Sequence, residues 1–237
     1  EVGGHRILTD PLLTRRVAHL RRRRELPTPD VADVDTVLLS HAHLDHLHLP
    51  SLRRAHPDTR FVTPFGTGRL LQAAGFTDVT EVRVGDTVHL DGPLVTAEVV
   101  PAAHKHGRGP HSRVSAPPVG DVVSGEGRRV YFPGDTDLFG GMASLDDIDV
   151  ALLPIWGWGS SLGVGHLDPT RAATATGLIR PGIVVPIHWG TYAPEDGRRQ
   201  LPSWFETPPD LFATALDDAD LSSHLHLLQP GESVTVS

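Results

Sequence analysis

The chain of 237 residues contains no cysteine. This absence excludes disulfide bonds, thiolate metal sites and a cysteine nucleophile, and it fits a protein of the reducing cytoplasm. No apolar run approaches the 18 residues that a membrane-spanning helix needs, and no signal-peptide pattern is visible. We therefore expect a cytoplasmic protein and expect no contact with a membrane.

Lysine is also scarce, because Lys105 is the only one, and acidic residues outnumber basic ones to give a formal net charge of −8. Proteins that bind nucleic acid usually carry a basic face, so we expect no nucleic-acid partner. A run of four arginines at positions 21–24 is the local exception. We interpret it as a solvated helix face or loop, with a site for phosphates or an anionic membrane surface as the alternative.

The rest of the composition is that of a globular protein, with 39% hydrophobic residues, and no repeat or linker divides it. We expect one domain over residues 1–237. Short runs rich in Val, Ile and aromatic residues predict strands at 36–40, 60–64, 95–102, 128–134, 149–155 and 182–188. Helical patterns lie between them at 49–56, 66–75 and 168–182, the last with Asp168 as N-cap. Strands alternating with helices predict an α/β fold.

Histidines and aspartates follow four of these strands directly, at the point where each strand ends. In α/β sheets, ligand sites form at the carboxyl ends of the strands, so these side chains converge if the strands are neighbours. The set comprises His41, His43, Asp45, His46, His104, Asp135 and His188.

Five imidazoles and two carboxylates without sulfur suit Zn²⁺, Mn²⁺ or Fe rather than a closed structural zinc site. Seven ligands exceed what one tetrahedral ion binds, whereas two ions that share a carboxylate match the count. We therefore expect two divalent metal ions as cofactors, with zinc as the first choice. The spacing of His41 and His43 lets both face one ion, while Asp45 and His46 turn toward the second.

The stretch "HAHLDH" resembles the H-x-H-x-D-H signature of the metallo-β-lactamase superfamily. The later positions follow the same order, in "VPAAHKH", "YFPGDTD" and "PIHWGTY". The stretches "RILTDPLL", "GHLDPTRA" and "PIHWGTY" look like the branch that holds L-ascorbate-6-phosphate lactonase and N-acylphosphatidylethanolamine phospholipase D. The resemblance covers nearly the whole chain and implies a four-layer αβ/βα sandwich with a two-metal hydrolytic site.

Carried over by position, the resemblance implies His41, His43 and His104 as ligands of the first metal. It implies Asp45, His46 and His188 as ligands of the second, with Asp135 bridging the two. True β-lactamases of this class commonly have Cys where Asp135 lies, which disfavours β-lactam hydrolysis here. The family's opening strands have no counterpart before "EVGGHRILTDP", so we expect the N-terminal strands to be missing.

These ligands predict a hydrolase that uses a bridging hydroxide on a small lactone, amide or phosphoester. A metal-stabilised binding module without catalysis and a di-iron redox protein are the alternatives. We expect Asp45 to orient the nucleophile. In the family that this chain resembles, a histidine at the position of His166 lines the site and contacts the substrate or protonates the leaving group.

Five further residues are weaker candidates. Asp10 is expected to fix the second nitrogen of a metal-binding histidine, unless it only forms the turn before a proline. Trp156 and Trp158 are expected to wall a substrate pocket. Arg108 is expected to pair with a substrate phosphate, with a solvated loop as the alternative. His106 is the rival of His104 as a ligand. The sequence predicts no oligomeric state.

Overall fold

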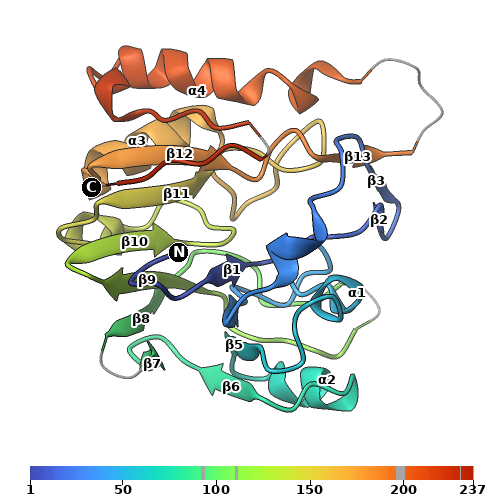
Figure 1. The fold of residues 1–237 in the computed structure, drawn as a ribbon. Helices are drawn as coiled ribbons and strands as arrows, with labels where there is room; N and C mark the ends of the chain where they lie inside the picture. Colours follow the sequence, from blue (N-terminus) through green and yellow to red (C-terminus); the bar gives the residue numbers. More distant parts are fainter. Residues whose placement is uncertain (92–93, 110–111, 196–200, 230, 237) are drawn as a thin grey trace.

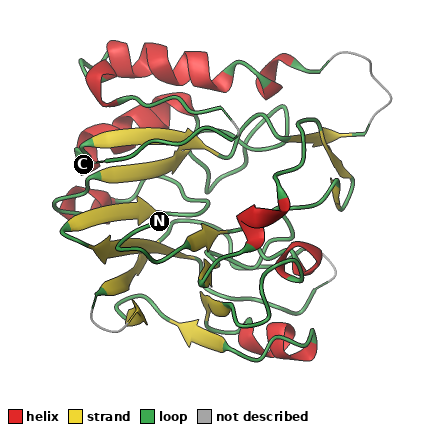
Figure 2. Cartoon of the chain, in the orientation of Figure 1, coloured by secondary structure: helices red, strands yellow, loops and turns green. Residues whose placement is uncertain are grey.

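The protein is a four-layer sandwich in which two β-sheets pack face to face and helices cover their outer faces (Figure 1). The computed structural model describes residues 1–91, 94–109, 112–195, 201–229 and 231–236. In Figure 2 the strands form the middle of the molecule, between helices above and below them. The αβ/βα architecture expected from the sequence is confirmed.

The first sheet has four parallel strands in the order β1-β4-β5-β6. They are β1 (Ile7–Thr9), β4 (Thr36–Leu38), β5 (Arg60–Pro64) and β6 (Val79–Val82). Side chains of β4 alternate between the two faces of the sheet, as the pleat requires. Val37 packs against the helical layer, while Leu38 packs into the space between the sheets. Because β4 is covered on both faces, all three of its residues are buried.

The second sheet has six strands in the order β12-β11-β10-β9-β8-β7. They are β7 (Thr87–Asp91), β8 (Val95–Pro101), β9 (Val119–Gly125), β10 (Arg128–Phe132), β11 (Val150–Pro154) and β12 (Ile183–Ile187). β9 is antiparallel to both of its neighbours, whereas β10, β11 and β12 are mutually parallel. Strands β8, β10, β11 and β12 therefore all end at the same edge of the sheet.

Two helices cover each outer face. The first sheet carries α1 (Leu49–Leu52) and α2 (Gly68–Ala73), and the second carries α3 (Pro169–Ile179) and α4 (Pro208–Asp217). The start of α3 is as predicted, because the Asp168 side chain accepts a hydrogen bond from the Arg171 backbone nitrogen at 2.8 Å. Four short 3₁₀ helices complete the chain, at Pro29–Ala32, Gly140–Ser144, Ser203–Phe205 and Ser222–His224.

Of the four arginines at 21–24, Arg21 and Arg22 belong to a small third sheet, whereas Arg23 and Arg24 lie in the loop that follows, as expected. Strand β3 (Leu20–Arg22) pairs antiparallel with β2 (Arg16–Val17) and with β13 (Tyr192–Pro194). Because β13 begins only four residues after His188, this sheet lies beside the C-terminal end of β12. Its alternation turns Leu20 inward and leaves Arg21 exposed.

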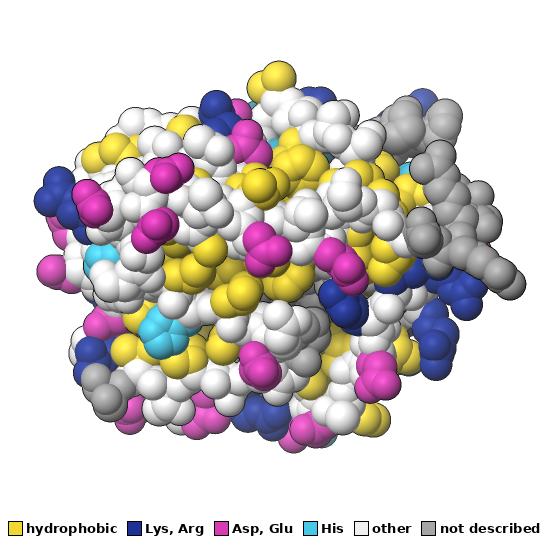
Figure 3. All heavy atoms as spheres, turned by 90° about the horizontal axis from the view of Figure 1, so that it is seen from above, with side chains coloured by type: hydrophobic (Ala, Val, Ile, Leu, Met, Phe, Trp, Pro, Cys, Tyr) yellow, Lys and Arg dark blue, Asp and Glu magenta, His cyan; other side chains and the backbone are white. Residues whose placement is uncertain are grey.

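The surface over α4 carries side chains of several kinds. Figure 3 shows acidic and basic side chains interspersed with hydrophobic ones on this face. Leu211 of α4 is 53% exposed, which is ordinary for a single surface leucine. Within the part of the chain that the structure describes, no helix combines the length and the apolar content needed to cross a bilayer.

Candidate metal centre

The structure brings together all seven residues that the sequence singles out as ligands. They come from the loop after β4 and from the segments after β8, β10 and β12. Antiparallel β9 is the only strand between β8 and β10, so the ends of β8, β10 and β12 meet at one edge, as described above. The loop after β4 reaches this edge from the facing sheet, which joins ligands that lie up to 147 residues apart in sequence (His41 to His188).

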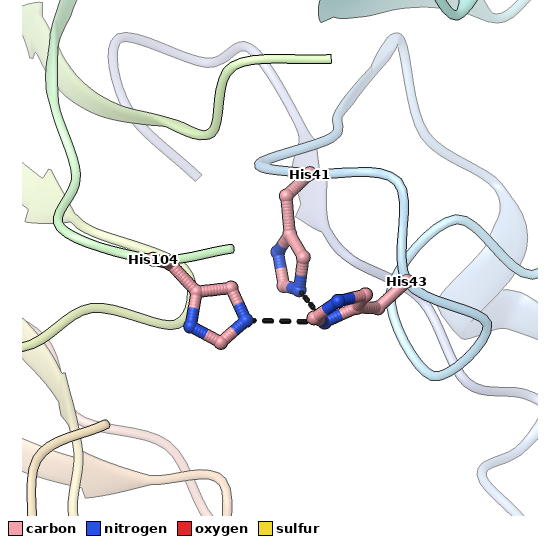
Figure 4. Close-up of side chains that lie close together, drawn as sticks. All are labelled: His41, His43 and His104. Carbon is pink, nitrogen blue, oxygen red and sulfur yellow. Dashed lines mark hydrogen bonds between the residues drawn. The ribbon is translucent and has the colours of Figure 1, made fainter. Parts of the chain in front are cut away.

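Three histidines form the first half of the centre (Figure 4). His41 Nε2 and His104 Nε2 each lie 3.0 Å from His43 Nδ1. His41 is fully buried and the ring of His104 is shielded from solvent. Their donor atoms lie close enough together to hold one ion. This is the first triad that the resemblance implies.

Asp45, His46 and His188 form the second half, with donor atoms again within reach of one ion. His46 Nε2 lies 3.2 Å from His188 Nε2 and 4.0 Å from Asp45 Oδ2. Asp135 lies between the halves, with Oδ2 at 3.3 Å from His46 Nε2 and 3.9 Å from His104 Nε2. Its position matches that of a carboxylate shared by two sites.

The second nitrogen of each of four ligand rings is fixed by a neighbour, as metal-binding histidines require. His41 Nδ1 lies 2.9 Å from Ser40 Oγ, and His46 Nδ1 lies 2.6 Å from Asp10 Oδ2. Backbone carbonyls hold the other two rings, Gly165 O for His104 at 2.6 Å and Trp156 O for His188 at 2.8 Å.

Asp10 connects both halves through this network. Its Oδ1 accepts from the Ser40 backbone nitrogen at 2.8 Å, and its Oδ2 accepts from Ser40 Oγ at 2.5 Å. One carboxylate therefore orients His46 directly and His41 through Ser40. Asp10 itself has a φ of 39°, a left-handed conformation that costs a non-glycine residue free energy and is often found at functional sites. The structure also leaves Asp10 close enough to His41 and His46 to serve as a ligand.

Two glycines allow the loops to approach the ligands closely. A Cβ atom on Gly134, which has a φ of 59°, would lie 2.2 Å from the Ser40 side chain. A Cβ atom on Gly165, which has a φ of 97°, would lie 3.1 Å from His104 Nδ1. Any larger residue would push apart the chain segments that carry Asp135 and His104.

Several histidines of the centre, and Asp135, have pKa values far from those of the free side chains. Burial lowers the pKa of His41 well below its ordinary range and that of His104 to about 4. Burial also opposes protonation of His46, but the carboxylates of Asp135 and Asp10 outweigh it and raise the pKa of His46 well above its ordinary value. Burial disfavours the charged form of Asp135, yet His188 and His46 hold its pKa well below the usual range.

The donor set fits divalent cations. Two nitrogens bound to one tetrahedral Zn²⁺ at about 2.0–2.1 Å lie about 3.3 Å apart, close to the ring separations of 3.0–3.2 Å seen here. Asp135 Oδ1 is buried without any hydrogen-bond donor, although His188 Nε2 lies 3.4 Å away. A buried carboxylate oxygen without a donor is costly unless it binds a cation.

His166 lies against the centre at the start of α3. Its Nε2 is 3.5 Å from Asp135 Oδ2, and its Nδ1 is 3.1 Å from Gly163 O. The contact with Asp135 raises the pKa of His166, although burial opposes the shift. Together with His104 and Asp135, His166 forms another group whose donor atoms could hold an ion. Its position therefore suits either the leaving group of a substrate or a bound ion.

A cavity of about 340 Å³ opens beside the second half of the centre. Asp45, His46, Asp135 and His188 line one part of it. Trp158 and Trp189 line it as well, and the substrate contact expected of Trp158 stays a prediction. Trp158 is 40% exposed and packs edge-on against the His19 ring. The volume lies at the small end of the range for ligand pockets.

Two expected substrate residues do not line this cavity. Arg108 Nη1 donates hydrogen bonds to the carbonyls of Ala42 and Leu47 at 2.9 Å each. These bonds stabilise the loop after β4 that carries the candidate ligands. Trp156 turns its indole to Gly159 O at 3.0 Å and contributes to the site through its carbonyl, which holds His188. Both residues therefore make contacts with the backbone that position the loops of the site, through Arg108 Nη1 and Trp156 Nε1.

Asp121 of β9 is a buried acid that the sequence reading missed. Its Oδ1 has no hydrogen-bond partner, and burial, followed by the charge of Asp10, raises its pKa to about 8. The pattern "VGDVVSG" gave only a weak signal, because a single acid in an apolar strand usually faces solvent. Here β9 is covered on both faces, so the carboxyl cannot reach water.

Asp121→Asn is expected to stabilise the protein increasingly as pH rises from about 4 to 8. In this window the folded state keeps the Asp121 proton and the unfolded state loses it, so the stability of the original protein falls with pH while that of the variant does not. The difference should grow by about 1 kcal/mol per pH unit in urea unfolding at pH 5.5 and 7.5. A constant difference, equal to that of the exposed control Asp91→Asn, would contradict a buried, protonated Asp121.

Paired sheets that deliver histidines and aspartates to one edge define a protein of metallo-β-lactamase fold. A family model described as "Beta-lactamase superfamily domain" matches residues 5–189. A UPF0173 metal-dependent hydrolase of Methanopyrus kandleri is 32% identical over 98% of this chain and 93% of its own length. The chain therefore belongs to the β-lactamase superfamily and, within it, to the UPF0173 metal-dependent hydrolases.

Other similar proteins define the same fold. An N-acyl-phosphatidylethanolamine-hydrolyzing phospholipase D of Caenorhabditis elegans is 29% identical over 81% of this chain, which corresponds to 61% of the nematode protein. The solved structure of Igni18, a metallo hydrolase of Ignicoccus hospitalis, superposes with a TM-score of 0.66 at 28% identity, covering 86% of this chain and 80% of that one. The resemblance to this superfamily predicted from "HAHLDH" is confirmed.

Proposed function

We propose that the protein is a metal-dependent hydrolase of a small molecule, with two divalent cations at the centre described above. Two ligand triads and one shared carboxylate support this proposal. His41, His43 and His104 would hold the first cation, Asp45, His46 and His188 the second, and Asp135 would be shared. The observation that carries the proposal is the convergence of these seven donors at one place, where Asp45, His46, Asp135 and His188 also line a cavity.

Bound cations would make a water molecule more acidic and would polarise the oxygen of the bond to be cleaved. The chain's own residues then position the reactants. Asp45, whose side chain is 18% exposed and lines the cavity, would orient the attacking water and take up its proton. His166, held by Asp135 and Gly163, would donate a proton to the leaving group, because its raised pKa keeps it protonated nearer to neutral pH.

The cavity supports a small lactone, amide or phosphoester as substrate. A volume of about 340 Å³ suits a small molecule and is too small for a complete two-chain phospholipid. Nitrogen and oxygen donors without sulfur favour Zn²⁺, with Mn²⁺ or Fe as the next choices. Iron would bring the alternative of redox chemistry. The solved structure of CmlA, a diiron β-hydroxylase from Streptomyces venezuelae, is 17% identical and shares the fold alone.

The experiment loads the full chain with Zn²⁺ or Mn²⁺ and measures bound metal together with turnover of lactones, amides and a phosphodiester. We expect close to two metal ions per chain and hydrolysis of at least one class, lost on chelation and restored by metal. Fewer than one metal ion per chain would overturn the proposal. Full metal loading without turnover of any class would favour a metal-stabilised binding module instead.

A further inference from the structure

The walls of the cavity are apolar and aromatic away from the metal centre. Leu12, Leu20, Trp158, Ile187 and Trp189 contribute to them. Arg22 is the single arginine or lysine among the residues that line the cavity. It comes from β3 of the small third sheet, two residues after Leu20, so both side chains point to the same face of the strand.

Arg22 is held rigidly by neutral partners. Its Nη2 donates to Leu12 O at 2.5 Å, and its Nη1 donates to Glu25 O at 3.3 Å. Its Nε faces both Thr14 O at 3.4 Å and the Tyr192 hydroxyl at 3.3 Å. The guanidinium carbon lies 4.9 Å from the centre of the Tyr192 ring. The side chain is therefore already ordered, so a ligand would not have to immobilise it.

The charge of Arg22 has no acidic partner among the residues that the structure describes, because none of their carboxylates lies within 4.0 Å of it. Its neighbours differ, since Arg16 and Arg21 both pair with Glu195, at 2.6 Å and 2.8 Å. A partly buried guanidinium without a counter-charge favours an anion at its side. Arg22 lines the cavity together with Asp45, His46 and His188, so an anion that enters the cavity can reach it beside the metal centre.

We infer that Arg22 selects substrates that carry an anionic group on an apolar body, with the group to be cleaved at the metal centre and the anionic group at Arg22. This inference rests on the proposed function and names its substrate class. The apolar walls would hold the body of the substrate between these two ends. Arg22 would thus determine specificity, while Asp45 and His166 carry the chemistry.

The test compares binding of matched ligands to the zinc-loaded full chain by calorimetry. The probes are succinate, glutarate and adipate, each paired with its monoamide, so that the members of a pair have the same shape and differ in one charge. One carboxylate of each probe can bind at the metal centre, and the other end reports on Arg22. We expect at least one dicarboxylate to bind about tenfold more tightly than its monoamide.

Three variants assign this preference to Arg22. Arg22→Gln should reduce it to about twofold or less, and Arg22→Lys should retain part of it because the charge remains. Arg21→Gln removes a charge from the same strand but outside the cavity, so it should leave the preference unchanged. Because each ratio is measured within one protein preparation, any loss of folded protein cancels.

The inference is overturned if no dicarboxylate is preferred, or if the preference survives in Arg22→Gln. It is also overturned if Arg22→Gln weakens both members of a pair equally, because Arg22 would then only hold the loops in place. The proposed hydrolase function is judged separately by turnover of the substrate panel. A protein that binds the dicarboxylates as expected without hydrolysing anything would retain the inference about Arg22 and lose the proposed reaction.

Discussion

Asp135→Asn is expected to lower the turnover of a hydrolysed substrate by about 10³-fold or more and to reduce bound metal from two ions per chain to one or fewer. The substitution keeps the size of the side chain but removes the negative charge that faces His46, His104, His166 and His188. Each metal ion contributes several kcal/mol to catalysis, and about 1.4 kcal/mol corresponds to a factor of ten.

Metal analysis and the melting temperature with and without added Zn²⁺ check this expectation. A ligand at 100 times its Kd stabilises the folded state by about 2.7 kcal/mol, so the original protein should melt at a clearly higher temperature after zinc is added. The variant should show a smaller rise. If Asp135→Asn kept both ions and more than a tenth of the turnover, a shared carboxylate would not be part of the site.

His104→Ala is expected to remove the first metal ion and to reduce turnover by about 10³-fold, whereas His106→Ala should change turnover by less than twofold. The two histidines lie two residues apart after β8, yet only His104 turns its Nε2 to His43, at 3.0 Å. His106 is exposed and is not part of any group that could hold a metal ion among the described residues. Comparing the two variants therefore tests whether His104, rather than His106, is the metal ligand.

Metal analysis and steady-state kinetics on both variants, with circular dichroism as a check of folding, measure this difference. Imidazole added to His104→Ala provides a further check, because it can occupy the space of the missing ring and should restore part of the activity. Equal losses in the two variants would mean that the segment acts through folding. Loss in His106→Ala alone would reverse the assignment.

The fold could be predicted largely because its central strands are buried on both sides. Strand β5 has the predicted limits of 60–64, and β4, β8, β10, β11 and β12 differ from prediction by a few residues at their ends. Strands β6, β7 and β9 were not predicted. β6 and β7 are partly exposed, so polar residues interrupt their apolar residues. β9 is buried, but Gly120, Asp121 and Ser124 interrupt its apolar run. Helix α1 is shorter than predicted and ends at Leu52, after which the chain turns through exposed arginines.

The candidate ligands could be selected from the sequence because metal chemistry favours histidine and aspartate at strand ends, a pattern that is rare by chance, and the structure brings them together. The surroundings of the centre could not be predicted in the same way. A contact of Asp10 with one of the metal-binding histidines was expected, and the structure shows that this histidine is His46. The contacts of His104 and His188 are with backbone carbonyls, which every residue has, so the sequence could not predict them. Arg22 could not be distinguished from the other three arginines of its run in the sequence. The structure distinguishes it, because Arg22 of β3 pairs with Tyr192 of β13 and lines the cavity, whereas Arg21 is exposed.

The most direct test of this account is an anomalous-scattering map of zinc-loaded crystals recorded at the zinc absorption edge. Two anomalous peaks are expected. One should lie about 2.0–2.1 Å from His41 Nε2, His43 Nδ1 and His104 Nε2, and the other should contact His46 and His188, with Asp135 touching both. A single peak outside these ligand groups, or no peak in fully loaded protein, would contradict the account.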